Sequence, residues 1–211
     1  MINKILKIVG IIILLIVVAL FAIPYFFKDQ IKAKIVAAIN ENVDAKVAFA
    51  EADLSLFKSF PQANVTIDKL SIINKAPFVG DTLVYFGELN LKMSIKELFK
   101  GKDEAMDIGA ITSKNGLINI IFNKDGIGNF DIALKNKEKK KSKSNPLSLK
   151  IKEYSIENYK FKYFDESSKI KMVIDSLNHS GTGDFAASKL DLVTKSTAKI
   201  SLDMDKINYM N

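Results

Sequence analysis

The feature that most constrains the fold is a two-residue alternation of apolar and polar side chains that recurs from Val47 almost to the end of the chain. In its clearest instance, the stretch ELNLKMSI, the apolar positions are Leu89, Leu91, Met93 and Ile95. Successive side chains of a strand point to opposite faces, so this pattern predicts strands with one dry face and one wet face. Helical signal after residue 42 is confined to the short stretch KELFKGK. The chain is therefore predicted to be mainly β, with a meandering, mostly antiparallel, twisted sheet.

Turn signals divide the alternation into individual strands. The segment AMDIGAITSKNGLINIIFNKDG is typical of two strands joined at Asn115-Gly116, a strong short-range hairpin signal. On the second of these strands three apolar residues share a face, namely Ile118, Ile120 and Phe122. Later alternations involve Tyr159, Phe161 and Tyr163, and then Ile170, Met172 and Ile174.

An uncharged run of 20 residues, Ile8–Phe27, precedes all of this. At about 1.5 Å per residue a helix of that length spans roughly 30 Å, the thickness of the bilayer's hydrocarbon layer. A cleaved signal peptide is the competing interpretation, but the run exceeds the usual apolar region and no small-x-small cleavage site follows it. We expect residues 1–28 to form an uncleaved signal anchor. The anchor residues are Ile8, Ile12, Leu15, Val18, Phe21, Tyr25 and Phe27.

The orientation of this anchor rests on its short N-terminal tail. Lysines flank the run on both sides, so counting them does not decide it. A short basic tail stays inside easily, whereas a long polar domain can cross whatever its charge. We expect the N-terminus to be cytoplasmic and the rest of the chain to lie outside the cytoplasmic membrane.

Residues 29–42 are predicted to form a short amphipathic helix after the anchor. Its apolar stripe consists of Ile31, Ile35, Ala38 and Ile39. Such a helix either lies on the lipid headgroups or caps the first strands of the sheet.

Composition argues against several classes of function. The chain carries 31 basic residues, all of them lysine, and a formal charge of +7. Without the bidentate fork of arginine, without tryptophan and without a phosphate loop, it is poorly equipped to read nucleic acid. The absence of cysteine excludes disulfides, thiolate metal sites and a cysteine nucleophile.

The sequence offers no convincing catalytic or metal-binding constellation. The lone histidine, His179, has no partner pattern around it, and the acidic pairs 103–104 and 165–166 sit in polar turns. No nucleophile elbow, paired histidines or Walker motif is present. We expect no enzyme activity, no catalytic residues, no metal and no cofactor.

A lysine-rich break, Lys135–Pro146, divides the β pattern into two regions, 43–134 and 147–211. Six lysines with one glutamate bury nothing, so we expect a mobile loop. The strand pattern runs close to the last residue, which favours a chain that is the front part of something longer.

The apolar faces of the predicted strands must be shielded from water. Burying four side chains such as those at positions 89 to 95 is worth roughly 6–12 kcal/mol, so such a face does not stay in water. Either a second layer of protein covers it, giving an ordinary closed core, or an apolar ligand does.

Several segments carry a resemblance to one family. The basic N-terminus, the single span and IKAKIVAAINENVDAKVAFAEADLSLFKSFPQANVTIDKLSIIN resemble the start of AsmA-like proteins. The block FVGDTLVYFGELNLKMSIKELFKGKDEAMDIGAITSKNGLINIIFNKDGIGNFDI is similar to the continuation of that region, ending in DG-x-x-N-F-D. IENYKFKYFDESSKIKMVIDSLNHSGTGDF resembles the segment that repeats later in that family.

The resemblance implies an inner-membrane protein whose periplasmic part is an open, twisted β-groove. It implies a role in outer-membrane biogenesis or homeostasis, with phospholipid or another acyl lipid passing along the groove by passive contact. On this interpretation the lipid-contacting residues are Leu89, Leu91, Met93, Ile95, Ile118, Ile120 and Phe122. The alternative remains a membrane-tethered structural or assembly factor whose apolar strand faces form a closed core.

Overall fold

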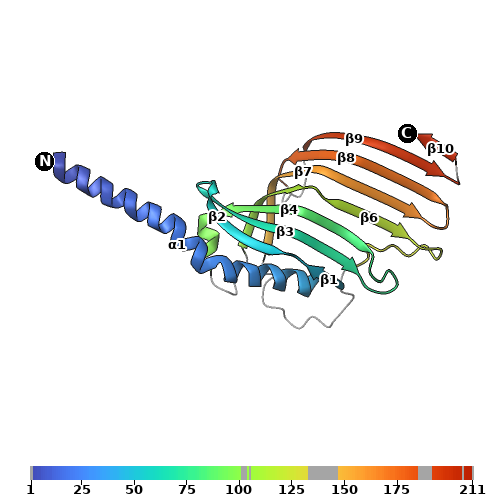
Figure 1. Ribbon diagram of the computed structural model, residues 1–211, viewed down its shortest axis with the longest axis horizontal. Helices are drawn as coiled ribbons and strands as arrows, with labels where there is room; N and C mark the ends of the chain where they lie inside the picture. The colour runs from blue at the N-terminus through green and yellow to red at the C-terminus, as the bar shows by residue number, and fades with distance from the viewer. Residues whose placement is uncertain are drawn as a thin grey trace.

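One long helix leads into one large sheet. The computed structural model of the protein describes residues 2–100, 104, 106–132, 147–184, 192–205 and 207–210. Helix α1 projects from one end of the sheet and then continues along its edge (Figure 1). The predicted mainly β fold, with an N-terminal apolar helix and an open sheet, is confirmed.

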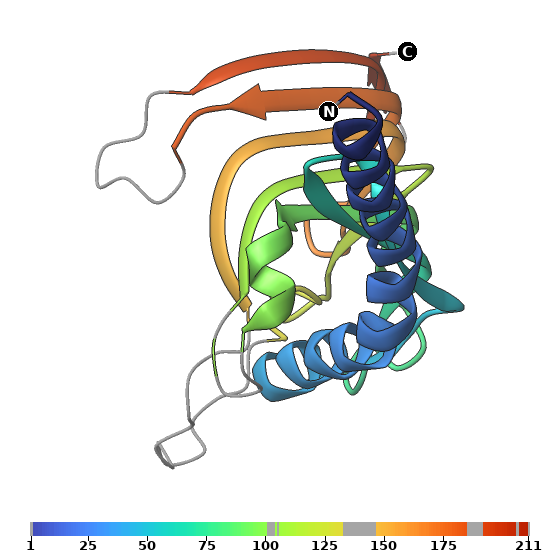
Figure 2. The ribbon, with the colours of Figure 1, turned by 90° about the vertical axis from the view of Figure 1, so that its left-hand side faces the viewer.

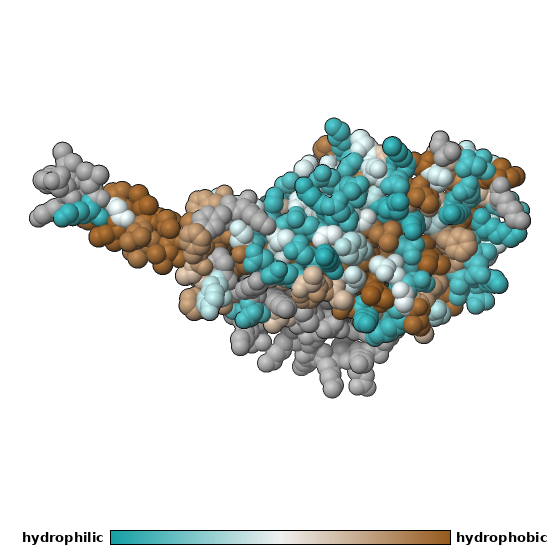
Figure 3. Space-filling view, in the orientation of Figure 1, coloured by the Kyte–Doolittle hydropathy of each residue, from teal (hydrophilic) through white to brown (hydrophobic). Residues whose placement is uncertain are grey.

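Helix α1, Ile2–Asn42, joins the predicted anchor and the predicted amphipathic segment in one element. It changes direction where it meets the sheet (Figures 1 and 2), and Pro24 in its interior removes a backbone hydrogen bond there. Within the described residues one helical span, Lys7–Phe27, is long and apolar enough to cross a membrane. Between its outer end and the sheet, the projecting half is hydrophobic on the face that Figure 3 shows. The side chains of the predicted stripe at positions 31 to 39 lie outside the described ones.

Ten strands and a short 3-10 helix follow among the residues that the structure describes. They are β1 Ala45–Ala48, β2 Glu51–Ser59, β3 Gln62–Asn74, β4 Thr82–Ser94, η1 Ile95–Phe99, β5 Met106–Lys114, β6 Leu117–Phe122, β7 Leu147–Asp165, β8 Ile170–Thr182, β9 Val193–Met204 and β10 Ile207–Met210. The predicted mobile loop at residues 135–146 lies outside the described part of the chain.

The strand order is β1-β3-β4-β5-β7-β8-β9-β10, with two places where two strands share one row. Strands β1 and β2 both pair with β3, and β5 and β6 both lie between β4 and β7. The pairing is antiparallel except that β7 runs parallel to β5 and β6. A parallel neighbour needs a long crossover, which the chain between Phe122 and Leu147 supplies.

The predicted hairpin at Asn115-Gly116 is wrong. Strands β5 and β6 do not pair with each other but continue one another, both antiparallel to β4 and both parallel to β7. Asn115 does adopt the left-handed conformation that the motif favours, with φ of 55°. Here that conformation bends one row of the sheet instead of reversing the chain.

A closed core fills the half of the sheet nearest the projecting helix. Its buried members come from β2, β3, β4, β5 and η1: Ala52, Leu54, Leu56, Ala63, Val65, Ile67, Leu70, Leu89, Leu91, Met93, Leu98 and Ile108. Helix α1 packs against this cluster through Leu20, Ile23 and Phe27. We call the face of the sheet that carries this core the inner face; the sheet curves around the side on which α1 lies (Figure 2).

Candidate functional site

A line of left-handed residues crosses the sheet and divides it into two halves. Lys69 on β3, Asn115 between β5 and β6, Asn158 on β7 and Ser176 on β8 have φ between 50° and 55°. Asn158 Nδ2 donates to Asn115 Oδ1 at 2.8 Å, which ties neighbouring rows at this line. Non-glycine residues rarely adopt this conformation, and asparagine tolerates it best. We call this line the crease.

Two glycines let the chain pass closely at the crease. On β4, a Cβ at Gly87 would stand 2.7 Å from the carbonyl oxygen of Asn115. At Gly116 a Cβ would overlap the ring of Tyr159. The sheet can therefore bend here without opening a gap between strands.

Tyr159 is the best buried side chain at the crease, with 1% of its surface exposed. Its hydroxyl donates to Ser113 Oγ at 2.6 Å, and Ser113 Oγ donates to the carbonyl oxygen of Glu88 at 2.6 Å. Burial raises the pKa of the Tyr159 phenol, and the hydrogen bond with Ser113 offsets part of that rise. This chain of hydrogen bonds links β7, β5 and β4.

The crease shifts the alternation of side chains by one residue. Apolar residues that are three apart flank it on four strands and stay on the inner face: Ile67 and Leu70, Phe86 and Leu89, Ile156 and Tyr159, and Ile174 and Leu177. Without the shift, the apolar residues beyond the crease would turn to the outer face. The inner face is therefore apolar on both sides of the crease in β3 and β4.

Beyond the crease, one apolar row runs across seven strands. Following the register from β1 to β9, its members are Val47, Ile72, Val84, Ile118, Phe161, Ile174 and Ile200. The first member packs against the closed core, which places the whole row on the inner face because residues directly opposite one another share a face. The last member is 44% exposed. The same apolar surface thus begins at the closed core and ends at an exposed residue.

Strands β6 to β9 carry the open part of this surface, which we call the apolar band. It consists of Ile118, Ile120, Phe122, Phe161, Tyr163, Met172, Ile174, Ile200, Leu202 and Met204. None of these side chains is fully buried, in contrast to the core beneath α1. The rings of Phe122 and Tyr163 lie 5.8 Å apart within the band. Four strands spaced about 4.8 Å apart make the band roughly 14 Å wide.

The outer face of the same strands is largely polar. Lys160 Nζ lies 3.0 Å from Asp175 Oδ2, and this hydrogen bond holds the pKa of Asp175 below its usual range. Residues paired on this face include Lys171 and Asp203. Its apolar residues are Leu117, Ile121, Val173 and Phe164, of which Phe164 is the most exposed at 41%. Strands β6 to β9 thus present an apolar inner face and a largely polar outer face.

The structure separates the seven predicted lipid-contact residues into two groups. Leu89, Leu91 and Met93 lie in the closed core, and Ile95 is half-buried on η1 against that core. The remaining three, on β6, lie in the apolar band. The sequence did not lead us to predict the band residues of β7, β8 and β9 as lipid contacts. Their two-residue alternation is the signal that could have identified them.

On β7 to β9, the inner face is more polar on the side of the crease that carries the closed core. Tyr154 Oη lies 2.6 Å from His179 Nε2, and His179 Nδ1 lies 2.6 Å from Ser196 Oγ. Both ring nitrogens are engaged, so the single histidine ties three strands together. Among the described residues no group of three or more acidic or histidine side chains is placed to hold a metal ion.

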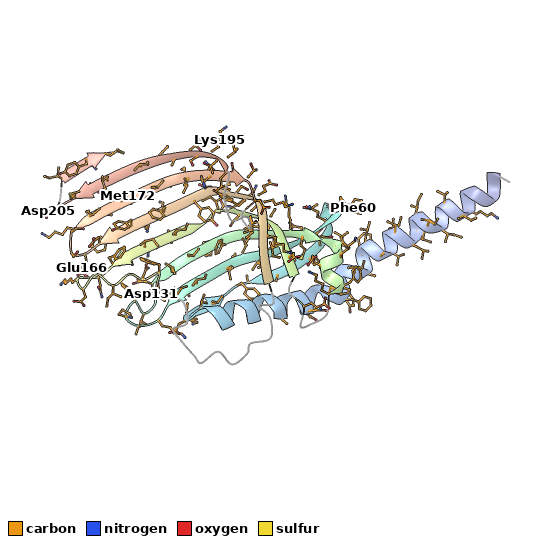
Figure 4. The ribbon with its side chains drawn as sticks, turned by 180° about the vertical axis from the view of Figure 1, so that it is seen from behind. Phe60, Asp131, Glu166, Met172, Lys195 and Asp205 are labelled. Atoms are coloured by element: carbon orange, nitrogen blue, oxygen red, sulfur yellow. The ribbon has the colours of Figure 1, made fainter. Side chains whose placement is uncertain are left out.

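Acidic residues lie beside lysines at the end of the sheet that is remote from the projecting helix: Lys124 Nζ is 3.5 Å from Glu166 Oε1, and Lys169 Nζ is 3.0 Å from Asp205 Oδ1. Figure 4 shows Asp131, Glu166 and Asp205 at that end, with Met172 of the band nearby and Phe60 at the opposite end. Asp165 closes the β7–β8 turn by accepting hydrogen bonds from Ser167 and Ser168. These hydrogen bonds, led by the one from the Ser168 backbone, lower the pKa of Asp165.

Comparison with known proteins gives one result that bears on this site. The model of the AsmA family matches residues 1–207, which confirms the family predicted from the sequence. No curated protein gave a match to the chain. The family and the apolar helix together support a membrane-associated protein of the outer-membrane biogenesis type, compatible with a single-pass anchor.

Proposed function

Since the chain belongs to the AsmA family, we propose that it binds acyl chains of phospholipid along the apolar band of strands β6 to β9. The observation that carries the proposal is the row from Val47 to Ile200, which packs against the closed core at one end and is exposed at the other. A folded protein gains nothing from an apolar surface left in water, whereas a lipid chain is a fitting cover.

Burial of methylenes supplies the binding energy. Each CH₂ group removed from water contributes about 0.8 kcal/mol, so ten methylenes laid across the band contribute roughly 8 kcal/mol before the costs of association. The headgroup stays in water beside the band, and no bond is made or broken. The proposed mechanism is passive and requires no catalytic residue, metal or cofactor.

We place the sheet in the periplasm, against the inner membrane, with the N-terminus in the cytoplasm. The support for this placement is the short basic tail before Ile8 and the large polar region after the span. In this arrangement the ligand is a lipid of the membrane that α1 spans. We expect no nucleic-acid partner, because the chain lacks arginine.

A second candidate, a tethered structural or assembly factor, is favoured by the other half of the sheet. There Leu89, Leu91 and Met93 are less than 10% exposed and behave as an ordinary core. The two candidates therefore differ only in what happens on β6 to β9.

Charged substitutions in the band test the proposal. The full chain is purified in detergent as wild type, as the double variant Met172→Glu with Ile200→Glu, and as the outer-face control Phe164→Glu. Phospholipid is then counted by mass spectrometry. Lipid held around α1 is common to all three, so the difference between variants reports on the sheet.

We expect the double variant to lose lipid relative to the wild type and to Phe164→Glu, with the circular dichroism of the sheet unchanged. If the double variant unfolds, the band is a sealed core and the structural candidate holds. If it folds and retains as much lipid as the control, the band does not bind lipid.

A further inference from the structure

The end of the sheet overlaps the end of the membrane span. Residues from Ile8 to Val18 are exposed all round, but from Ala19 onward parts of the helix are covered. Leu20, Ile23 and Phe27 pack against the closed core of the sheet. The last two turns of the apolar run are thus shared between the anchor and the folded domain.

The free part of the helix is too short to cross a bilayer. Residues 8–18 number 11 and span about 16 Å, roughly half of a 30 Å hydrocarbon layer. The layer must therefore extend to the level of residues 19–27, where the sheet is already packed against the helix. The end of the sheet then lies within the boundary between headgroups and acyl chains.

Two exposed aromatic residues stand at this end. The β2–β3 turn carries Phe60, which is 63% exposed, and η1 carries Phe99, which is 61% exposed. The pairing of Gln62 with Ser94 brings the two turns to the same end of the sheet. The rings of Phe99 and Phe27 lie 5.5 Å apart, so η1 sits at the depth at which the span ends.

The charge of η1 suits a lipid surface. Its one acid, Glu97, is neutralised by Lys100 Nζ at 2.6 Å and accepts from the backbone N–H of Asp107 at 2.8 Å. Lys96 remains exposed on the same turn. An aromatic tip beside an exposed lysine is typical of segments that rest in the headgroup layer, where rings bury their apolar body and lysine meets phosphate.

We propose that Phe60 and Phe99 insert into the surface of the membrane that α1 spans, so that the sheet is docked on the bilayer by its β2–β3 and η1 end. The anchor alone would leave α1, together with the sheet packed against it, free to tilt relative to the bilayer. With two further contacts, the sheet stands on the membrane in one orientation, with the end that carries Glu166 turned away from the bilayer.

The chain has no tryptophan, so single tryptophans can report on depth. The variants Phe60→Trp and Phe99→Trp are reconstituted as full chain in vesicles of phosphatidylethanolamine and phosphatidylglycerol. A share of the lipid is phosphatidylcholine brominated on its acyl chains, which quenches tryptophan on contact. Leu15→Trp, inside the span, is the positive control. Phe164→Trp, at the far end of β7, is the negative control.

We expect Phe60→Trp and Phe99→Trp to lose most of their emission in brominated vesicles, as Leu15→Trp does, while Phe164→Trp keeps its emission. Bromines near the headgroup end of the chains should quench both tips more than bromines near the methyl end. The proposal is overturned if Leu15→Trp is quenched while Phe60→Trp emits like Phe164→Trp. Because Phe60 lies on an exposed turn, that variant decides the matter even if Phe99→Trp disturbs the contact with Phe27.

Discussion

The two halves of the inner face should respond differently to the same loss of side chain. Leu91 is 7% exposed and lies in the closed core, whereas Ile200 is 44% exposed in the apolar band. Truncating a buried leucine to alanine costs about 2–5 kcal/mol, because a cavity remains. Full burial of an isoleucine is worth about 1.5–3 kcal/mol, so a side chain that is only about half covered contributes roughly 1 kcal/mol.

Urea unfolding of the full chain in detergent, followed by circular dichroism of the sheet, measures this difference. With a slope of about 2 kcal/mol per molar urea, Leu91→Ala should lower the midpoint by roughly 1–2.5 M and Ile200→Ala by about 0.5 M or less. The slope itself should not change. Equal losses for the two variants would refute the division of the inner face into a closed and an open half.

Three further predictions concern the crease and the far turn. Tyr159→Phe should lower the free energy of unfolding by about 1 kcal/mol, because the hydrogen bond to Ser113 is lost. Since burial raises the pKa of Tyr159, the stability of the wild type should also fall as the pH rises past the unfolded value of 10.0. Urea titration should show this alkaline loss in the wild type and not in the variant. Gly116→Ala should lower the free energy of unfolding by about 1–3 kcal/mol, because the new methyl group overpacks against the Tyr159 ring. The control Gly109→Ala, whose Cβ meets its nearest neighbour at 3.8 Å, should shift the urea midpoint far less. Equal shifts would contradict the close approach at the crease. Asp165→Asn should flatten the acid limb of the pH–stability curve, because the lowered pKa of Asp165 contributes stability that is present above the unfolded value of 3.8 and lost as pH falls through the folded pKa; an unchanged acid limb would show that the turn does not depend on the carboxylate.

The strands were predictable from sequence because each one carries its own two-residue alternation, as in Leu89, Leu91 and Met93. The division between closed and open surface was not predictable from that pattern. It depends on where α1 lies. The contact of Leu20 and Ile23 with the core is a tertiary contact, and the local periodicity of the strands does not predict it.

The crease had a sequence signal that is easily misread. A left-handed asparagine is expected in a hairpin turn, so Asn115-Gly116 taken by itself predicts a hairpin. The spacing of three between Ile156 and Tyr159, and between Ile174 and Leu177, shows that the same alternation changes phase within other strands. A phase change repeated on neighbouring strands predicts a bend across a sheet.

The parallel placement of β7 was also beyond local patterns. Nothing within Leu147–Asp165 distinguishes a parallel neighbour from an antiparallel one, because the side chains alternate in both. The sequence signal for a parallel neighbour is the long connection before Leu147, which is long enough to bring the chain back to the end of the sheet where β5 begins.

Photo-crosslinking at two matched positions tests the central claim most directly. Ile200 on the inner face and Phe164 on the outer face are 44% and 41% exposed, so a benzophenone amino acid at either site meets solvent about equally. In native membranes containing radiolabelled phospholipid, irradiation should attach label to the chain carrying the probe at 200 and leave the chain carrying it at 164 unlabelled. Equal labelling of both, or labelling of neither, would contradict a lipid-binding surface on the open half of the sheet.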